Sequence, residues 1–312
     1  MNAPTISIAP HRFAFGYYRQ VWWNWLISTA FFLGGIGSGL FVVSWATHYA
    51  LGILVGYLIV VIGKNTAHLL YLGRPERFWR AAMRPDRSWI ARGIWASAIF
   101  AVSGLVCLLA LWANAPWQFP NWLNSAAAAI ALASALFISF YDGFVMNHSA
   151  AIPFWNSRLL PILVLMYATL GGVTLSLTLR QLQSMDGSTT EFLAHCERLL
   201  LAINFLLLCG YLWRMANWAP AAHETVRSLL RGTYTRAFVG LVVLIGIGAT
   251  LLLSLLQDRV QATWLVFLIV TCELTGDFTL ILLLLKSGLF APQTARRYLP
   301  GNAGLWSRQI PF

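Results

Sequence analysis

Two carboxylic acids lie one helical turn apart in a stretch where ionised groups are costly. Glu273 and Asp277 both fall in a long apolar run, with Gly276 between them, and their i, i+4 spacing places both on one helix face. Two ionised carboxylates would repel each other there, so one is expected to hold a proton or to have a cationic partner, such as Lys64 or Arg92. The pair is therefore a candidate proton relay, and an ion pair is the purely structural alternative.

A second set of polar residues lies in other apolar runs. Lys64 and His68 are one turn apart, and Tyr71 follows His68 by three residues. Lys64 and His68 could form a proton path or a ligand site, or they could be an interior ion-pair partner and a hydrogen-bonded core histidine. Asp142 follows Tyr141 near the end of a later run and is either a functional carboxylate or a helix-end aspartate that reaches headgroup water. The proton-transfer candidates are Lys64, Asp142, Glu273 and Asp277.

One long charged stretch, residues 72–92, interrupts the apolar sequence, and we call it the docking loop. Its arginines offer paired donors to carboxylates and backbone carbonyls, and its aromatic residues are the usual anchors of protein interfaces. A protein partner outside the membrane is the favoured interpretation, and an amphipathic loop lying on anionic lipid is the alternative. The predicted docking residues are Arg74, Arg77, Phe78, Trp79, Arg84, Trp89 and Arg92.

The composition is that of a membrane protein. Hydrophobic residues make up 59% of the 312 residues and charged residues only 10%, against roughly 25% in soluble domains, and the mean hydropathy is +0.68. The formal net charge of +11 lies between apolar runs, where membrane topology explains it better than nucleic-acid binding does. The four cysteines include no C-x-x-C pair and lie in or beside apolar runs, which indicates packing and predicts no metal site in this chain.

Eight apolar runs are each long enough for one helical crossing, which takes about 20 residues. They lie at about 22–47, 50–71, 93–113, 122–146, 158–180, 197–217, 237–257 and 262–286. The predicted fold is all-α, a polytopic membrane protein with eight transmembrane helices in a single integral membrane domain over residues 1–312. Two four-helix bundles are expected within it, at about 22–146 and 158–286, followed by a C-terminal tail at 287–312.

The distribution of basic residues predicts the orientation in the membrane. An even number of crossings places both termini on one side, together with the docking loop. Nearly all Lys and Arg residues then lie on that side, and the exceptions are Lys64, Arg180, Arg198 and Arg259. By the positive-inside rule, the termini and the docking loop are predicted to be cytoplasmic.

Three local features give more specific structural predictions. Gly35 and Gly39 form a G-x-x-x-G pair in the first run, which favours close helix packing over a phosphate-binding loop. The polar connection from Arg180 to Arg198 is predicted to be a loop with a short surface helix. Trp155, in the loop after the fourth crossing, is predicted to lie at the membrane interface.

Several short motifs occur together in an arrangement that is typical of one family. They are Leu72-Gly73-Arg74-Pro75, Arg77-Phe78-Trp79, Ser88-Trp89-Ile90, Pro153-Phe154-Trp155-Asn156 and Glu273-x-x-Gly276-Asp277. Over residues 22–292 the chain resembles the NrfD/PsrC family, whose members are eight-helix, quinone-interacting membrane subunits of bacterial respiratory complexes. The N-terminal Phe15-Gly16-Tyr17 and Arg19-Gln20 resemble most closely the members associated with phenylacetyl-CoA:acceptor oxidoreductases.

The resemblance implies a role in electron transport. It implies a membrane anchor without haem, bound to a four-cluster ferredoxin-type iron-sulfur subunit, which in turn connects to a molybdenum or tungsten pterin catalytic subunit. This chain would be an oxidoreductase subunit that lacks the catalytic centre and holds ubiquinone or menaquinone non-covalently, with no covalent cofactor. The complex would sit in the inner membrane of a bacterium.

The resemblance also implies a location for the quinone, under the docking loop and between the first four helices. Tyr141 matches a tyrosine that contacts quinone in relatives. Tyr71 stands where some relatives have a histidine, so His68 is an alternative donor, and Asn24 is predicted to supply a second hydrogen bond. Two-electron reduction puts charge on both quinone oxygens, so each needs a hydrogen-bond donor and then a proton.

Two other functions remain as alternatives. A haem b membrane anchor needs paired axial histidines that face each other inside the bundle, and only His68 lies well inside a predicted crossing. A secondary transporter usually has inverted repeats with helices broken at mid-membrane. The sequence contains no convincing internal repeat.

Overall fold

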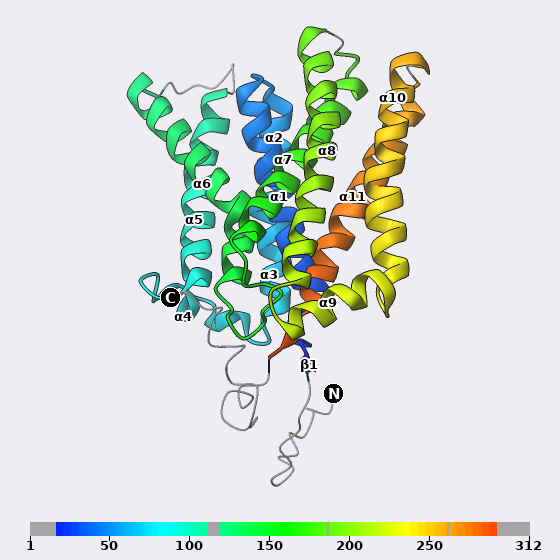
Figure 1. Cartoon of the computed structure of the whole chain (residues 1–312). Coiled ribbons are helices and arrows are strands. Elements are labelled where there is room, and N and C mark those ends of the chain that lie inside the picture. The colour runs from blue at the N-terminus through cyan, green and yellow to red at the C-terminus, as the bar shows by residue number, and fades with distance from the viewer. Residues whose placement is uncertain (1–16, 112–118, 186, 261, 292–312) are drawn as a thin grey trace, which may run out of the picture.

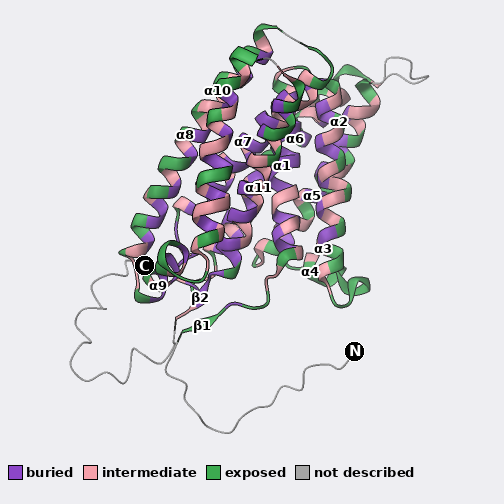
Figure 2. Cartoon of the chain, turned by 90° about the vertical axis from the view of Figure 1, so that its right-hand side faces the viewer, coloured by how far each residue is buried: buried purple, intermediate pink, exposed green. Residues whose placement is uncertain are grey.

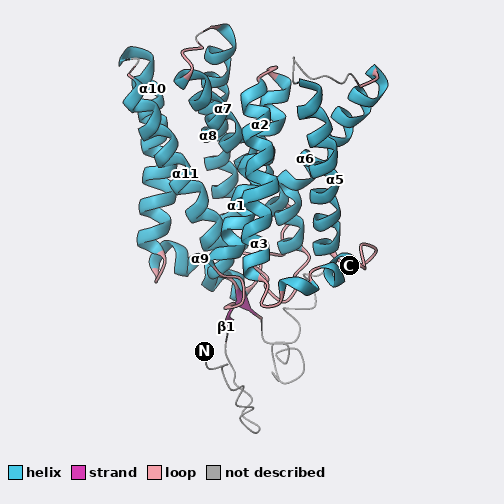
Figure 3. Ribbon diagram, turned by 180° about the vertical axis from the view of Figure 1, so that it is seen from behind, coloured by secondary structure: helices cyan, strands magenta, loops and turns pink. Residues whose placement is uncertain are grey.

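The computed structural model describes residues 17–111, 119–185, 187–260 and 262–291. Long helices run roughly side by side through the molecule (Figures 1 and 3). In these ranges, eight helices are long and apolar enough to cross a membrane. The prediction of an all-α polytopic membrane protein is therefore confirmed, and the division into two four-helix bundles stays a prediction.

The N-terminal half contains four of these crossings. They are α1 (Trp25–Ala46), a continuous crossing made of α2 (Ala50–Leu58), the π-helical segment η1 (Ile59–Lys64) and α3 (Asn65–Tyr71), then α5 (Trp89–Leu111) and α6 (Asn121–Asn147). The docking loop runs from the end of α3 into the first turn of α5, and it contains the 3-10 turn η2 (Pro75–Arg77) and the short helix α4 (Trp79–Ala82).

The C-terminal half contains the other four. They are α7 (Leu159–Leu182), α8 (Ser188–Ala216), the π-helical segment η3 (Arg236–Ala249) continued by α10 (Thr250–Val260), and α11 (Thr263–Lys286). The amphipathic helix α9 (Pro220–Arg231) lies across the end of the molecule that carries the docking loop (Figure 1).

A small sheet joins the two ends of the described chain. Strand β1 (Tyr18–Arg19) pairs antiparallel with β2 (Leu289–Phe290), so that Tyr18 faces Phe290. Both strands lie at the docking-loop end (Figure 1), as an even number of crossings requires. Residues 292–312 of the predicted tail lie outside the described residues.

Helix α1 forms the centre of the molecule and packs against α2, α6, α7 and α11. A Cβ atom on Gly39 would collide with the backbone of α7 at Ala168, and a Cβ atom on Gly172 would collide with the backbone of Gly39. The predicted close packing through Gly39 is therefore confirmed, with α7 as the partner. Buried residues line the inner helix faces, and exposed ones point outward (Figure 2).

Two local predictions are wrong. Residues 188–198 are not a loop, because α8 begins at Ser188 and the polar residues of its first turns include Glu197, which is buried inside the bundle. Trp155 is 2% exposed, so its ring faces the protein interior and not the lipid headgroups. Its Nε1 donates a hydrogen bond to the carbonyl oxygen of Leu284 at 2.7 Å, and its ring stacks on Trp23. The loop after α6 folds inward and packs against α11.

Candidate functional site

Lys64 is buried in the N-terminal half and is the last residue of the π-helical segment η1. Its Nζ donates to the hydroxyl oxygen of Ser97 in α5 at 2.7 Å. A Cβ atom on Gly34 would lie 3.0 Å from Cδ of Lys64, so this glycine of α1 makes room for the lysine stem. π-helical turns often accompany functional positions, and here the turn ends at a buried cation.

Asp142 is the buried acid that interacts electrostatically with Lys64. It is 2% exposed in α6, and its Oδ1 has no hydrogen-bond partner among the described residues. The charges of Asp142 and Lys64 are close enough to attract each other, but these two described side chains form no direct ion pair. A base and an acid therefore share the interior of the N-terminal half, which is what transfer of a proton requires.

His68 and Tyr141 are brought together around one phenylalanine. The ring of Phe31 in α1 lies 6.1 Å from the His68 ring and 6.3 Å, edge to face, from the Tyr141 ring. Nδ1 of His68 is 3.1 Å from the carbonyl oxygen of Lys64, which leaves Nε2 for another partner. Tyr141 is buried, at 4% exposed, and its hydroxyl group makes no hydrogen bond to another described residue.

Tyr71 and Asn24 both contact the entry to α1. The hydroxyl group of Tyr71 donates to the carbonyl oxygen of Trp22 at 3.1 Å. Oδ1 of Asn24 accepts from the backbone N–H of Leu26 at 2.9 Å and so caps the helix. These bonds hold the start of α1 against α3. The predicted roles of both residues towards quinone stay predictions.

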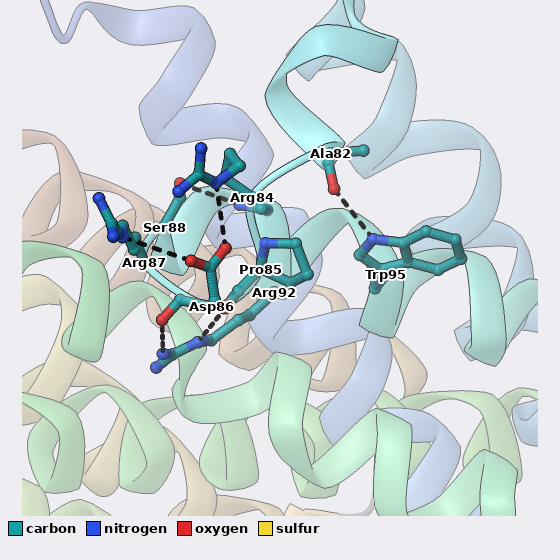
Figure 4. A network of polar contacts seen from close by, with 9 residues as sticks. Ala82, Arg84, Pro85, Asp86, Arg87, Ser88, Arg92 and Trp95 are labelled. Atoms are coloured by element: carbon teal, nitrogen blue, oxygen red, sulfur yellow. Dashed lines mark hydrogen bonds and ion pairs between the residues drawn. The ribbon is translucent and has the colours of Figure 1, made fainter.

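The docking loop is held in shape by its own side chains (Figure 4). Nε of Arg92 donates to the carbonyl oxygen of Pro85 at 2.8 Å, and its terminal nitrogen donates to that of Asp86 at 3.1 Å. The Asp86 carboxylate also pairs with Arg84 at 3.3 Å and with Arg87 at 3.4 Å. Nε1 of Trp95 donates to the carbonyl oxygen of Ala82 at 3.0 Å and ties the loop to α5.

The predicted docking residues divide into two groups. Arg74, Arg77, Phe78 and Trp79 are exposed in the first part of the loop, around η2 and the start of α4, which we call its tip, with Phe78 47% and Trp79 48% exposed. Trp89 instead stacks on Phe144 of α6, with Arg92 over its ring, and Arg84 and Arg92 bond within the loop. The first group is available to a partner, and the second group supports the loop.

Glu273 of the C-terminal half lies in a buried cluster of acids and hydroxyl groups. Oγ1 of Thr174 in α7 is 2.6 Å from Oε2 of Glu273 in α11 and 3.0 Å from Oε1 of Glu197 in α8. All three side chains are at most 3% exposed. The suggested pairing with Lys64 or Arg92 is wrong, because those cations bond to Ser97 and to the docking loop.

Glu197 connects this cluster to the end of the bundle opposite the docking loop. Its Oε2 accepts a hydrogen bond from the Ser254 hydroxyl in α10 at 2.8 Å. The guanidinium group of Arg198 donates to the hydroxyl and carbonyl oxygens of Ser254 and pairs with Asp258. The side chain of Arg198 is 15% exposed and that of Asp258 is 56% exposed, so this ion pair lies at the surface of the bundle, near the end of α10.

Asp277 faces a narrow apolar pocket between α1, α7 and α11, which we call the interior pocket. Tyr167, Phe31 and Leu284 also line it. Oδ2 of Asp277 and the hydroxyl group of Tyr167 are buried there without a hydrogen-bond partner among the described residues. Because Phe31 also contacts His68 and Tyr141, the interior pocket and the quinone candidates share one wall.

Sequence reasoning missed Glu197, Thr174 and Ser254 as members of a site. The polar residues around Glu197 favour a loop at this position. A signal for a longer helix is nonetheless present, because Ser188-Thr189-Thr190-Glu191 has the spacing of a capping box at a helix start. For Thr174 and Ser254 no sequence signal exists, since hydroxyl groups are common in membrane helices.

Tyr49, between α1 and α2, lies in a polar cluster at the end opposite the docking loop. Its hydroxyl group donates to Oε1 of Gln183 at 2.8 Å, and the guanidinium group of Arg180 lies over its ring, donating to the carbonyl oxygen of Thr47. Burial raises the pKa of the Tyr49 phenol, and the charge of Arg180 opposes this shift. The cluster fixes the turn between the first two crossings.

In the described ranges, no group of three or more His, Cys, Asp or Glu side chains is arranged to hold a metal ion. In a comparison with known protein families, residues 15–292 fit a family model described as "Polysulphide reductase, NrfD". A search of curated proteins finds no matching protein.

Proposed function

This chain belongs to the polysulphide reductase NrfD family, and we propose that it exchanges electrons between an iron-sulfur subunit and a membrane quinone. The family consists of membrane subunits of quinone-interacting oxidoreductase complexes. In the proposed complex this chain is the membrane anchor that carries the quinone site, and another subunit carries the catalytic centre.

The observation that carries this proposal is the position of His68, Tyr141 and Phe31 directly beneath the docking loop. His68 lies in the last turn of α3, where the loop begins, and Tyr141 lies in the last two turns of α6. Electron transfer needs a short distance between donor and acceptor. A quinone between these residues would lie close to a redox subunit bound at the loop.

The residues present fit a flat, apolar ring with two oxygen atoms. Phe31 and Phe137 give the Tyr141 region an aromatic wall, suited to edge and face contacts with a ring. The Tyr141 hydroxyl group and Nε2 of His68 are the available hydrogen-bonding groups. A bound quinone supplies the two-electron chemistry, and these two side chains orient it and bond to its oxygens.

Proton handling is assigned to Lys64 and Asp142. Two protons accompany two electrons in quinone reduction, and they leave again in quinol oxidation. The Asp142 carboxyl group can hold a proton beside Tyr141, and the nearby Lys64 charge stabilises the carboxylate after the proton has left. These residues hold and move protons in either direction of electron flow.

The exposed tip of the docking loop, with Arg74, Arg77, Phe78 and Trp79, is the proposed contact with the iron-sulfur subunit. Its arginines suit an acidic or carbonyl-rich surface, and its two aromatic side chains are available as anchors. The iron-sulfur subunit would connect to a molybdenum or tungsten pterin subunit. The basic residues at this end support a cytoplasmic location for it, by the positive-inside rule.

Purification of the chain from its native membrane in mild detergent tests this function. We expect an iron-sulfur protein and a pterin-containing protein to co-purify, and organic extraction to yield ubiquinone or menaquinone. A chain that purifies alone, without redox partners and without quinone, would contradict the proposal. A reduced haem absorption band intrinsic to this chain would favour the haem b alternative instead.

A further inference from the structure

The four crossings of the C-terminal half each contribute to one buried polar cluster. The members are Thr174 from α7, Glu197 from α8, Ser254 from α10 and Glu273 from α11. Each is at most 3% exposed. Buried polar groups in a membrane interior are costly, so a cluster to which all four of these crossings contribute indicates a function in addition to packing.

The contacts of Thr174 favour a bound proton in this cluster. The Thr174 hydroxyl group has one hydrogen and lies within hydrogen-bond distance of a carboxyl oxygen of both Glu197 and Glu273. It makes its best hydrogen bond to only one of them. The second contact is satisfied when the other carboxyl group donates to the Thr174 oxygen, and this also removes the repulsion between two buried carboxylates. We infer that one of the two glutamates carries a proton.

The arrangement allows this proton to move. If Glu197 is protonated on Oε1, it donates to Thr174, which donates to Glu273. Transfer moves the Glu197 proton to the Thr174 oxygen while the Thr174 hydrogen passes to Oε2 of Glu273. The products are an ionised Glu197, an unchanged Thr174 and a protonated Glu273. The numbers of protons and charges in the cluster are unchanged by the transfer, and the same steps in reverse return the proton to Glu197.

On one side, this unit is connected to the end of the bundle opposite the docking loop. Arg198 donates to the Ser254 oxygen, which directs the Ser254 hydrogen to Oε2 of Glu197. Arg198 cannot release a proton, so it acts as a positioning residue. The Ser254 hydroxyl group can pass its hydrogen to Oε2 of Glu197 while the free lone pair of its oxygen takes a proton from water near the exposed Asp258, and the reverse steps return the proton to that water.

On the other side, the unit leads to the interior pocket. Oε1 of Glu273, Oδ2 of Asp277 and the Tyr167 hydroxyl group are all buried without a partner among the described residues. The Tyr167 group is close enough to both carboxyl groups to interact electrostatically with them. Water or a bound ligand normally satisfies such atoms, and either can carry a proton between them.

We propose that Glu197, Thr174, Glu273, Tyr167 and Asp277 form a proton relay that connects the membrane face opposite the docking loop with the interior pocket. Beyond Asp277 the pocket is apolar and ends at Phe31, the residue that contacts His68 and Tyr141. The relay itself follows from the contacts alone. Its use in supplying or removing the protons of quinone chemistry rests on the proposed function.

Infrared spectroscopy of the purified complex tests the shared proton without any quinone assay. We expect an absorption band of a protonated carboxylic acid that shifts in D₂O. Glu197→Gln and Glu273→Gln should each remove or change it, since either substitution breaks the shared proton. A band that neither substitution alters, or the absence of such a band, would overturn the proposal.

Thr174→Val is the sharpest test of the link, because valine keeps the shape of threonine and removes the hydroxyl group. Thr178→Val is the matched control, since the Thr178 hydroxyl group bonds only to the backbone of its own helix. We expect Thr174→Val to shift the carboxylic acid band and to slow quinone turnover by about 100-fold, the lower end of what one positioned proton-transfer group contributes. Activity with a soluble dye that bypasses quinone should stay unchanged.

The outcomes separate the two proposals. Equal quinone rates for Thr174→Val and Thr178→Val would refute the use of the relay in quinone chemistry. A wild-type complex that does not react with any quinone would refute the proposed function, and the infrared result would still decide whether the proton is shared.

Discussion

The ring of Tyr141 lies directly against Gly93, at the contact between α6 and α5. A Cβ atom on Gly93 would overlap two ring carbon atoms of Tyr141 and would lie 2.8 Å from its hydroxyl oxygen. Tyr141 is buried, so its ring has little room to move away. Gly93 therefore fixes the position of the hydroxyl group that is the first candidate for a bond to quinone.

Gly93→Ala should impair quinone turnover without removing any polar group. The added methyl group must displace the Tyr141 ring, and a displacement of about 1 Å can cost up to about 100-fold in rate. We expect a large loss with quinone and no loss with a soluble dye. Gly210→Ala in α8 is the control, because its Cβ would meet no described atom within 4 Å apart from its chain neighbours and the backbone of its own helix. Equal behaviour of the two variants would show that Tyr141 does not need this position.

Tyr141→Phe and His68→Ala test the proposed hydrogen bonds to quinone. Each variant should lower quinone turnover by about 100-fold, because one positioned donor is lost. Tyr57→Phe is a suitable control in the same half, since the Tyr57 hydroxyl group donates to the backbone of Ala101. Steady-state rates with quinone and with a dye should be measured in parallel. A matching decrease in both assays would mean that the residues are structural.

The crossings and the docking loop could be predicted because they depend on local composition. Apolar runs of sufficient length define the helices. The four-residue spacing of Gly35 and Gly39 predicts where α1 packs closely against another helix. The position of Trp155 could not be predicted in this way. A tryptophan in a loop beside a membrane helix usually lies at the interface, and only the folding of that loop against α11 buries it.

The buried acid cluster shows a different limit of sequence reasoning. Glu273 and Asp277 stood out because a carboxyl group in an apolar run is unusual, but their partners did not. Thr174 is 99 residues from Glu273 in the chain, and the contact depends on how α7 and α11 are rotated against each other. A cation was the expected partner, and the structure provides a hydroxyl group and a second acid. Composition cannot specify such helix rotations.

Arg74→Glu combined with Arg77→Glu should release the partner protein. Both side chains are exposed at the tip of the docking loop, and reversal of two charges would repel an acidic surface. We expect the iron-sulfur subunit to be lost from the purified complex while the membrane subunit is still inserted. Arg259→Glu, an exposed residue at the opposite end, should keep the complex intact. Unchanged co-purification of the double variant would rule out docking at this tip.

Arg92→Ala should loosen the docking loop while leaving its exposed tip unchanged in sequence. Arg92 makes two hydrogen bonds to the carbonyl oxygens of Pro85 and Asp86, and alanine makes neither (Figure 4). We expect faster cleavage of the loop by trypsin in the isolated subunit, and weaker partner binding as a consequence. Arg87→Ala is the control, because the Arg87 side chain pairs with the exposed Asp86 carboxylate and bonds to no backbone carbonyl among the described residues. Equal cleavage rates for the two variants would show that the Arg92 bonds do not hold the loop.

Lys64→Met and Asp142→Asn should interact when combined. Each single variant leaves a buried polar group without its electrostatic partner and should lower the thermal stability of the subunit in detergent. The double variant removes both charges, so its loss should be smaller than the sum of the two single losses by about 1 kcal/mol or more. Thermal unfolding of all four proteins measures this difference. Strict additivity would mean that Lys64 and Asp142 act separately, and the proton-handling role would then fall to Asp142 alone.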